Sequence, residues 1–184
     1  MVSLALGTVQ FGLPYGVSNT QGQVTANEAI KIISFALKNQ IDMFDTAMLY
    51  GQSEQVLGEL LPTEQGRIIT KTPHFEQGIS TLAWLEHLRD SFKHSLNRLQ
   101  RRSVYGLLVH RVEDLISDQG QAIWQLMQTF KKEGRISKIG VSVYTPASLA
   151  IVLDRYDIDL VQLPLNIFDQ RMIHTGLLEK LKRR

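Results

Sequence analysis

The sequence predicts an α/β fold of the (β/α)8 TIM-barrel type, incomplete here with about six βα units. Short apolar runs of four to eight residues alternate with segments of helical periodicity, which is typical of a parallel sheet with helical crossovers. The runs are continuously apolar, as expected for strands that helices cover. Four side chains with acid–base chemistry, Asp45, Tyr50, Lys71 and His110, stand at or just past the carboxyl ends of three such runs. Because those ends converge on one face of a barrel, we expect the four to meet there.

The individual elements follow from periodicity and end signals. The first run, Leu4–Gly7, ends at a glycine and is followed by a loop rich in Gly and Pro. Thr25 and Glu28 form a capping-box signature before apolar residues at helical spacing. The other expected strands are Met43–Ala47, Arg67–Lys71, Val104–Val109, Ile136–Val143 and Leu160–Leu165, and the other expected helices are Glu54–Leu61, Leu82–Leu99, Ala122–Phe130, Leu149–Leu153 and Leu177–Leu181.

A doubly wound nucleotide-binding sheet is the competing architecture. It would need a glycine-rich turn after its first strand, whereas the stretch from Gly7 to Gly12 reads GTVQFG. This is neither G-x-G-x-x-G nor a P-loop with its Lys and Ser/Thr. Because the candidate residues are spread over several strand ends, the barrel is favoured.

Length and composition narrow the class of protein. The 184 residues are most simply one domain, spanning 1–184, and 43% hydrophobic residues suit a soluble globular protein. Twenty basic and eighteen acidic residues give a net charge of +2, which implies no nucleic-acid partner. The absence of cysteine excludes disulfides and thiol catalysis, and no ligand spacing predicts a metal site. No run approaches the length of a membrane span, so a cytoplasmic location is expected.

The motifs around the four candidate residues are similar to those of the aldo/keto reductase family. The acid and the tyrosine are five residues apart, and Gly51 and Glu54 follow them. The resemblance is carried by Phe44–Gly51, Ser53-Glu54, Leu57-Gly58, Ile69–Lys71, Leu96–Leu99, Leu107–His110, Gly134–Ile136, Gly140–Ser142, Gln162, Asn166 and Gly7-Thr8, and it covers nearly the whole chain.

This resemblance implies an NADP(H)-dependent oxidoreductase that reduces an aldehyde or ketone to an alcohol. The family's four catalytic positions fall on Asp45, Tyr50, Lys71 and His110. The implied cofactor-binding residues are Gly7, Thr8, Asp45, Ser142 and Gln162. No metal and no membrane are implied, and the partner is a small carbonyl compound.

The chain departs from the family pattern at two positions and in length. Val143 stands where many members have Asn, and Leu165 where many have Tyr. A full barrel needs eight strands and about 250 residues, whereas six strands are counted here. We therefore expect a C-terminally truncated member. Its two unpaired edge strands offer a route to self-association, and its cofactor binding is expected to be weak.

The chemistry of the four residues suits carbonyl reduction. Tyr50 is expected to donate the proton, with the ammonium of Lys71 lowering the pKa of the phenol. Asp45 would hold Lys71 charged, and His110 would hydrogen-bond the substrate oxygen. The alternatives are a non-catalytic barrel that serves as a regulatory or interaction subunit, an inactive truncated product, and a lyase or isomerase that uses Lys71 as a Schiff-base amine.

Overall fold

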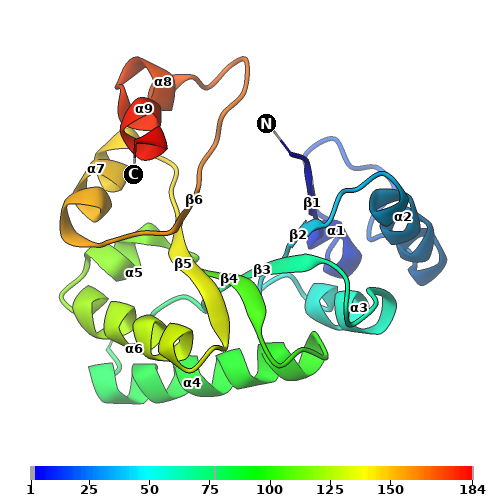
Figure 1. Cartoon of the computed structure of the whole chain (residues 1–184), viewed down its shortest axis with the longest axis horizontal. Coiled ribbons are helices and arrows are strands. Elements are labelled where there is room, and N and C mark those ends of the chain that lie inside the picture. Colours follow the sequence, from blue (N-terminus) through cyan, green and yellow to red (C-terminus); the bar gives the residue numbers. More distant parts are fainter. Residues whose placement is uncertain (1–2, 77, 184) are drawn as a thin grey trace.

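A computed structural model describes residues 3–76 and 78–183. Strands and helices alternate along the chain, as Figure 1 shows. The strands are β1 (Ala5–Gly7), β2 (Met43–Asp45), β3 (Arg67–Lys71), β4 (Val104–Val109), β5 (Ile136–Ser142) and β6 (Leu160–Gln162). The helices are α1 (Val9–Gly12), α2 (Ala26–Lys38), α3 (Ser53–Leu60), α4 (Thr81–Arg98), α5 (Val112–Ile116), α6 (Gly120–Lys132), α7 (Pro146–Arg155), α8 (Arg171–His174) and α9 (Leu177–Lys182).

The six strands form one parallel sheet in the order β1-β2-β3-β4-β5-β6. Every neighbouring pair is parallel, and the sheet curls so that β1 and β6 stand at opposite ends of it (Figure 1). The predicted fold class is thereby confirmed, because the arrangement is an incomplete (β/α) barrel. Its register pairs Gly7 with Asp45 and Ser142 with Gln162, which sets the carboxyl ends of adjacent strands side by side.

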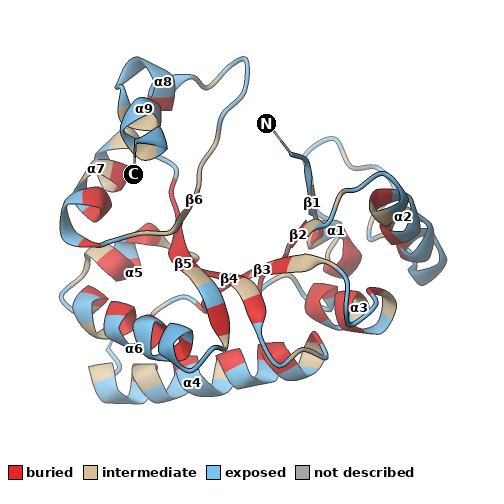
Figure 2. Ribbon diagram, viewed as in Figure 1, coloured by how far each residue is buried: buried red, intermediate tan, exposed pale blue. Residues whose placement is uncertain are grey.

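The core lies between the sheet and the helices on its convex side. Buried residues cluster on the central strands and on the helix faces turned toward them (Figure 2). Phe44, Leu107 and Val141 from the strands belong to this cluster together with Leu88 and Ile123 from α4 and α6. This packing explains the continuous apolar runs of the sequence, because helices cover one face of each strand while the other lines the barrel interior.

Helix starts follow the side-chain chemistry of their first residues. The hydroxyl of Thr25 accepts a hydrogen bond from the backbone N–H of Glu28 at 3.3 Å, which confirms the predicted capping signature. Ser80 and Thr145 cap α4 and α7 in the same way. Each cap satisfies a backbone donor that the first turn leaves without a partner.

The strand predictions were close, whereas three short helices were not predicted. Arg67–Lys71 and Val104–Val109 match β3 and β4 in full, and the other strands end one to three residues earlier than expected or begin one later. The unpredicted helices are α1, α5 and α8, each four or five residues long. Segments this short do not display a helical repeat, so periodicity cannot reveal them.

The edges of the sheet are open. β1 and β6 each pair with one neighbour among the described residues, and both are only three residues long. Around them Leu4, Leu165 and Phe168 are exposed. Within residues 3–76 and 78–183, no helix is long and apolar enough to cross a membrane.

Candidate active site

The four predicted catalytic residues meet at the carboxyl edge of the sheet. Asp45 is the last residue of β2 and Lys71 the last of β3, while His110 follows β4 directly. Tyr50 lies in the turn between β2 and α3. Neighbouring parallel strands end at the same level, so residues as far apart in sequence as Tyr50 and His110, 60 positions, come into contact.

Lys71 is the centre of the group. Its side chain is only 1% exposed, and its Nζ donates to Asp45 Oδ1 at 2.7 Å, to the backbone oxygen of Thr46 at 2.9 Å and to the Tyr50 hydroxyl at 3.2 Å. Burial lowers the pKa of Lys71, and the carboxylate of Asp45 opposes that shift. The ammonium is thus held by three oxygens at the end of β3, and its position is fixed.

The pKa of Tyr50 is raised to about 12, opposite to the expected lowering. Burial is the largest cause, and the negative charge of Asp45 adds to it. Because Asp45 balances the ammonium of Lys71, the phenol meets a nearly neutral ion pair instead of a free cation. Tyr50 therefore keeps its proton at neutral pH, which suits a proton donor.

His110 is neutral at physiological pH. Burial, Lys71 and His74 together lower the pKa of its imidazole to about 4. Its ring contacts that of Tyr50 edge-on, with centroids 5.8 Å apart, and its backbone N–H donates to the hydroxyl of Thr72 at 3.2 Å. Nδ1 is buried and has no hydrogen-bond partner among the described residues. A buried N–H without an acceptor is costly, so the proton belongs on Nε2.

The loop that carries Tyr50 is fastened to the end of β1. The hydroxyl of Ser53 donates to the backbone oxygen of Thr8 at 2.8 Å and bonds the hydroxyls of Thr8 and Thr46. Gly12 packs so tightly here that a Cβ at this position would lie 1.8 Å from the backbone oxygen of Tyr50. Local packing thus sets the height of the phenol above the strand ends.

The expected cofactor residues divide into two groups. Ser142 and Gln162 line a hollow of about 220 Å³ together with Tyr50 and Tyr144. The hollow is formed where β5 and β6 end, and the backbone N–H of Val143 donates to the backbone oxygen of Gln162 there. A nicotinamide is a flat pyridine ring that carries a carboxamide. The hydroxyl of Ser142 and the amide of Gln162 lie beside the phenol of Tyr50 here, so the residues present fit such a group.

Gly7 and Thr8 lie at the other side of Asp45. Gly7 has open space where a side chain would be, which leaves room next to the paired Asp45. The hydroxyl of Thr8 is buried and donates to the backbone oxygen of Asp45 at 2.9 Å. This hydroxyl is engaged within the protein, and a role of Thr8 in cofactor binding stays a prediction.

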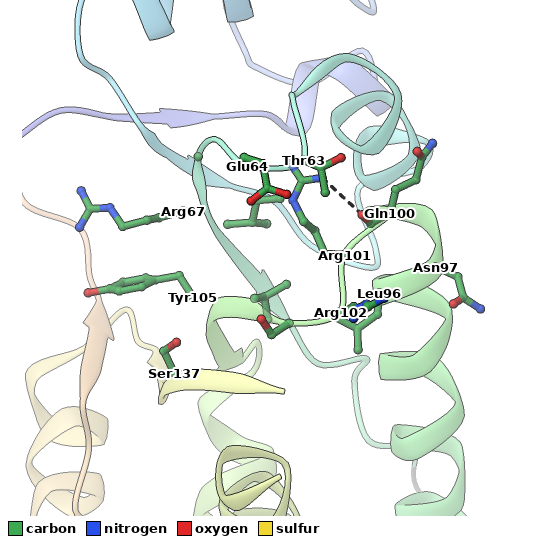
Figure 3. Close-up of a pocket in the computed structure, with 14 residues that line it drawn as sticks. Thr63, Glu64, Arg67, Leu96, Asn97, Gln100, Arg101, Arg102, Tyr105 and Ser137 are labelled. Atoms are coloured by element: carbon green, nitrogen blue, oxygen red, sulfur yellow. Dashed lines mark hydrogen bonds between the residues drawn. The ribbon is translucent and has the colours of Figure 1, made fainter. Parts of the chain in front are cut away.

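A larger hollow, of about 910 Å³, lies at the opposite end of the strands and contains none of the predicted site residues. It is bordered by the starts of β3 and β4, where the guanidinium of Arg67 stacks over the ring of Tyr105 at 5.4 Å (Figure 3). Arg67 also forms a forked ion pair with Asp42, and Arg101 donates to the backbone oxygens of Leu61 and Pro62. These cations are engaged in holding strand and loop starts together.

Three contributors to the site were not predicted. They are the backbone oxygen of Thr46, the ring of Tyr144 in the hollow and the imidazole of His74 against His110. His74 and Tyr144 follow the ends of β3 and β5 by three and two residues. The rule that strand ends converge places both near the site, whereas the contact of His74 with His110 and the role of a backbone oxygen leave no trace in the sequence.

Comparison with known proteins agrees with this geometry. Residues 3–184 match the Aldo/keto reductase family. A protein of Pseudomonas aeruginosa described as an aldo-keto reductase superposes with a TM-score of 0.76 at 26% identity, over 95% of this chain and 68% of that one. An aldo-keto reductase of Bacillus halodurans in its holo form superposes with a TM-score of 0.73 at 25% identity, over 97% and 58%.

A glycerol dehydrogenase of Gluconobacter oxydans shares the fold, with a TM-score of 0.70 at 23% identity over 97% of this chain and 56% of that one. The chain thus spans between 56% and 68% of the length of these three proteins. No curated protein matches it. Since the family match extends over residues 3–184, the chain belongs to the aldo/keto reductase family.

Proposed function

We propose that this chain carries the catalytic part of an NADP(H)-dependent oxidoreductase that reduces an aldehyde or ketone to an alcohol. The observation that supports this most directly is the relay of contacts from Asp45 through Lys71 to Tyr50, at 2.7 and 3.2 Å. A phenol in contact with an ion-paired ammonium at a strand end is an arrangement for delivering a proton to a substrate oxygen.

Each of the four residues has a separate role in this reaction. A bound nicotinamide cofactor supplies the hydride. Tyr50 donates its proton to the oxygen on which negative charge develops, and Lys71 stabilises the phenolate that remains. Neutral His110, with its proton on Nε2, donates a hydrogen bond to the same oxygen and sets the angle of the carbonyl. Asp45 keeps Lys71 charged and oriented.

Ser142 and Gln162 support the cofactor assignment. Their side chains border the hollow beside Tyr50, where they would hydrogen-bond the carboxamide of the nicotinamide. Gly7 leaves space next to Asp45 for the ribose side of such a cofactor. The preference for NADP(H) over NAD(H) is carried over from the family resemblance and belongs to the proposal.

Schiff-base chemistry at Lys71 is disfavoured by the same geometry. An amine nucleophile must be deprotonated and accessible, whereas Nζ of Lys71 is buried, paired with Asp45 and bonded to two further oxygens. The arrangement suits a fixed charge.

The proposal is tested by measuring NADPH oxidation with an aromatic aldehyde. Two proteins are compared: the chain itself, and the chain extended by the part of the Pseudomonas aeruginosa protein that lies beyond the superposed region. We expect weak cofactor binding and slow turnover from residues 1–184, and faster turnover from the extended protein. In the extended protein Tyr50→Phe is expected to lower the rate by about 10²–10⁴-fold, because the proton donor is lost.

A control variant is Tyr105→Phe, which removes a hydroxyl at the opposite end of the strands. It should leave the rate unchanged. Inactivity of both proteins would contradict the proposal and favour the non-catalytic subunit, and so would activity that Tyr50→Phe does not reduce. Micromolar NADPH affinity of the chain alone, measured by fluorescence titration, would contradict the expected weak binding.

A further inference from the structure

His74 lies against His110 at the edge of the candidate site. The two ring centroids are 5.0 Å apart with an interplanar angle of 65°, a closer contact than that between Tyr50 and His110. His74 is not one of the four predicted catalytic residues, and its side chain is exposed. Two rings, from Tyr50 and His74, therefore restrict the imidazole of His110.

The backbone on both sides of His74 is clamped to the loop that carries His110. Before it, Thr72 donates its N–H to the backbone oxygen of Leu108 at 2.9 Å and accepts from the N–H of His110 at 3.2 Å. After it, the N–H of Phe75 donates to Asp114 Oδ2 at 3.0 Å, and the guanidinium of Arg111 donates to the oxygen of Phe75.

The carboxylate at the centre of these contacts is buried and paired with a partly exposed guanidinium. The carboxylate of Asp114 is only 3% exposed and receives a forked pair of hydrogen bonds from Arg111 at 2.8 and 2.6 Å. The ring of Phe75 packs on Trp84 of α4 with centroids 5.1 Å apart. The effect of these contacts is to hold two imidazoles from separate loops at a fixed mutual position.

We propose that His74 is a positioning residue that fixes the ring of His110, so that Nε2 faces the substrate pocket as a hydrogen-bond donor. The proposal rests on the proposed function only in assigning His110 to the site. The ring of His74 blocks rotation of the imidazole of His110 about its Cβ–Cγ bond, which would exchange Nδ1 with Cδ2 and Nε2 with Cε1. Since Nδ1 has no hydrogen-bond partner among the described residues, no hydrogen bond of Nδ1 opposes this rotation, and the contact with His74 has to oppose it.

His74 also helps to keep His110 uncharged. The ionisable groups facing His110 are Lys71 from β3, Tyr50 from the turn after β2 and His74 from the loop after β3. Asp45 is neutralised by Lys71, and Asp114 by Arg111, so neither carboxylate is free to stabilise an imidazolium. Burial is the largest cause of the lowered pKa of His110, and the electrostatic effects of Lys71 and then of His74 add to it.

The test is the state of His110 in imidazole nitrogen NMR spectra recorded from pH 8 to pH 3.5. Four forms of the chain are compared: the wild type, His74→Ala, His74→Phe and His87→Ala. His87 is an exposed histidine on α4 that contacts Ser91, and its substitution controls for the loss of any surface imidazole. Neither cofactor nor substrate enters the measurement, so its result is independent of whether the chain turns over.

In the wild type we expect a single tautomer of His110 with its proton on Nε2 and a titration midpoint near 4. His74→Ala should raise the midpoint, by less than burial and Lys71 together lower it, and introduce the second tautomer. His74→Phe restores a ring without nitrogen and should restore the single tautomer, while His87→Ala should match the wild type. A His74→Ala spectrum equal to that of the wild type overturns the proposal, as do equal changes in the His74→Phe or His87→Ala proteins.

Discussion

At the scale of single residues, the site shows how an ion pair changes what a cation does to its neighbour. Lys71 lies 3.2 Å from the Tyr50 hydroxyl, yet the pKa of Tyr50 is raised, because burial and Asp45 outweigh the ammonium. A phenol of this kind stays protonated until charge develops on a substrate oxygen. Under the proposed function, this protonation state suits proton donation, and the reverse oxidation should require alkaline conditions.

The first prediction concerns this phenol. In a spectrophotometric titration of tyrosinate absorbance, the difference between the wild type and Tyr50→Phe should show one phenol with a midpoint at about 12, because burial penalises its charged form. The chain has five tyrosines, and Tyr105→Phe, at the opposite end of the strands, serves as the control. A difference curve with its midpoint at or below 10 would show that Lys71 dominates after all.

The second prediction concerns acid stability. The unfolded chain protonates His110 near pH 6.5, whereas the folded chain does so only near 4. Between these values the unfolded state binds more protons, so stability that is present above pH 6.5 is lost as the pH falls to 4. For this half-buried group the loss should be about 1–2 kcal/mol after solvent screening.

Urea denaturation at pH 7 and pH 4 measures this loss of stability between the two pH values. His110→Asn should lose less stability than the wild type over this interval by that amount, and His94→Asn, on the surface of α4, should behave as the wild type. Equal losses in the wild type and His110→Asn would show that the imidazole is not protected from protons.

These residues also show what the sequence could predict. The convergence of Asp45, Tyr50, Lys71 and His110 followed from their places at strand ends, since parallel strands end at one edge. The sign of the Tyr50 shift did not follow, because it depends on the balance between burial and two opposite charges. The contact of His74 with His110 was missed, because hydrogen bonds between two loops position it.

At the scale of elements, a buried carboxylate joins α3, β3 and α4. Glu54 is 1% exposed and accepts hydrogen bonds from Thr70 at 2.6 Å, from Ser95 at 3.0 Å and from Arg98 at 2.9 and 2.6 Å. Helices α3 and α4 pack closely against each other, since a Cβ on Gly58 of α3 would lie 2.0 Å from the backbone oxygen of Arg98 at the end of α4. The network therefore fixes α3, and with it the turn that carries Tyr50.

The third prediction tests this junction. Glu54→Gln keeps the shape of the side chain but removes its charge, so the guanidinium of Arg98 loses its partner. We expect the free energy of unfolding to fall by about 2–3 kcal/mol, measured by chemical denaturation.

Glu59→Gln on the same helix is the matched control. Glu59 is exposed, and its hydrogen bond is to the neighbouring Gln55, so its substitution should change stability by no more than about 0.5 kcal/mol. If the two variants were equally stable, the network at Glu54 would contribute nothing beyond packing.

At the scale of the whole molecule, the open edges of the half-barrel are its most exposed feature. β1 and β6 present unpaired backbone groups, although each is only three residues long, which limits the surface on which another chain could pair. Exposed apolar side chains accompany both edges, with Leu4 at 70% and Phe168 at 96% exposure. We propose that the chain self-associates through these edges as its concentration rises.

The fourth prediction follows from this arrangement. Leu4→Lys places a charge next to the β1 edge and should weaken concentration-dependent association, measured by sedimentation velocity. Val17→Lys adds the same charge at a fully exposed loop position and should leave association unchanged. Association that responds to both variants alike would reflect net charge, and a monomer at every concentration would contradict self-association.

The sequence by itself determined the repeating strand–helix order, because hydrophobic periodicity is a local property. That order favours a parallel sheet, and parallel strands end at one edge, where Asp45, Tyr50, Lys71 and His110 gather. The tertiary structure alone decided the protonation of Tyr50 and His110, the burial of Glu54 and the position of His74. Those features depend on desolvation and on distances between groups far apart along the chain, and such distances exist only once the strands have been brought side by side.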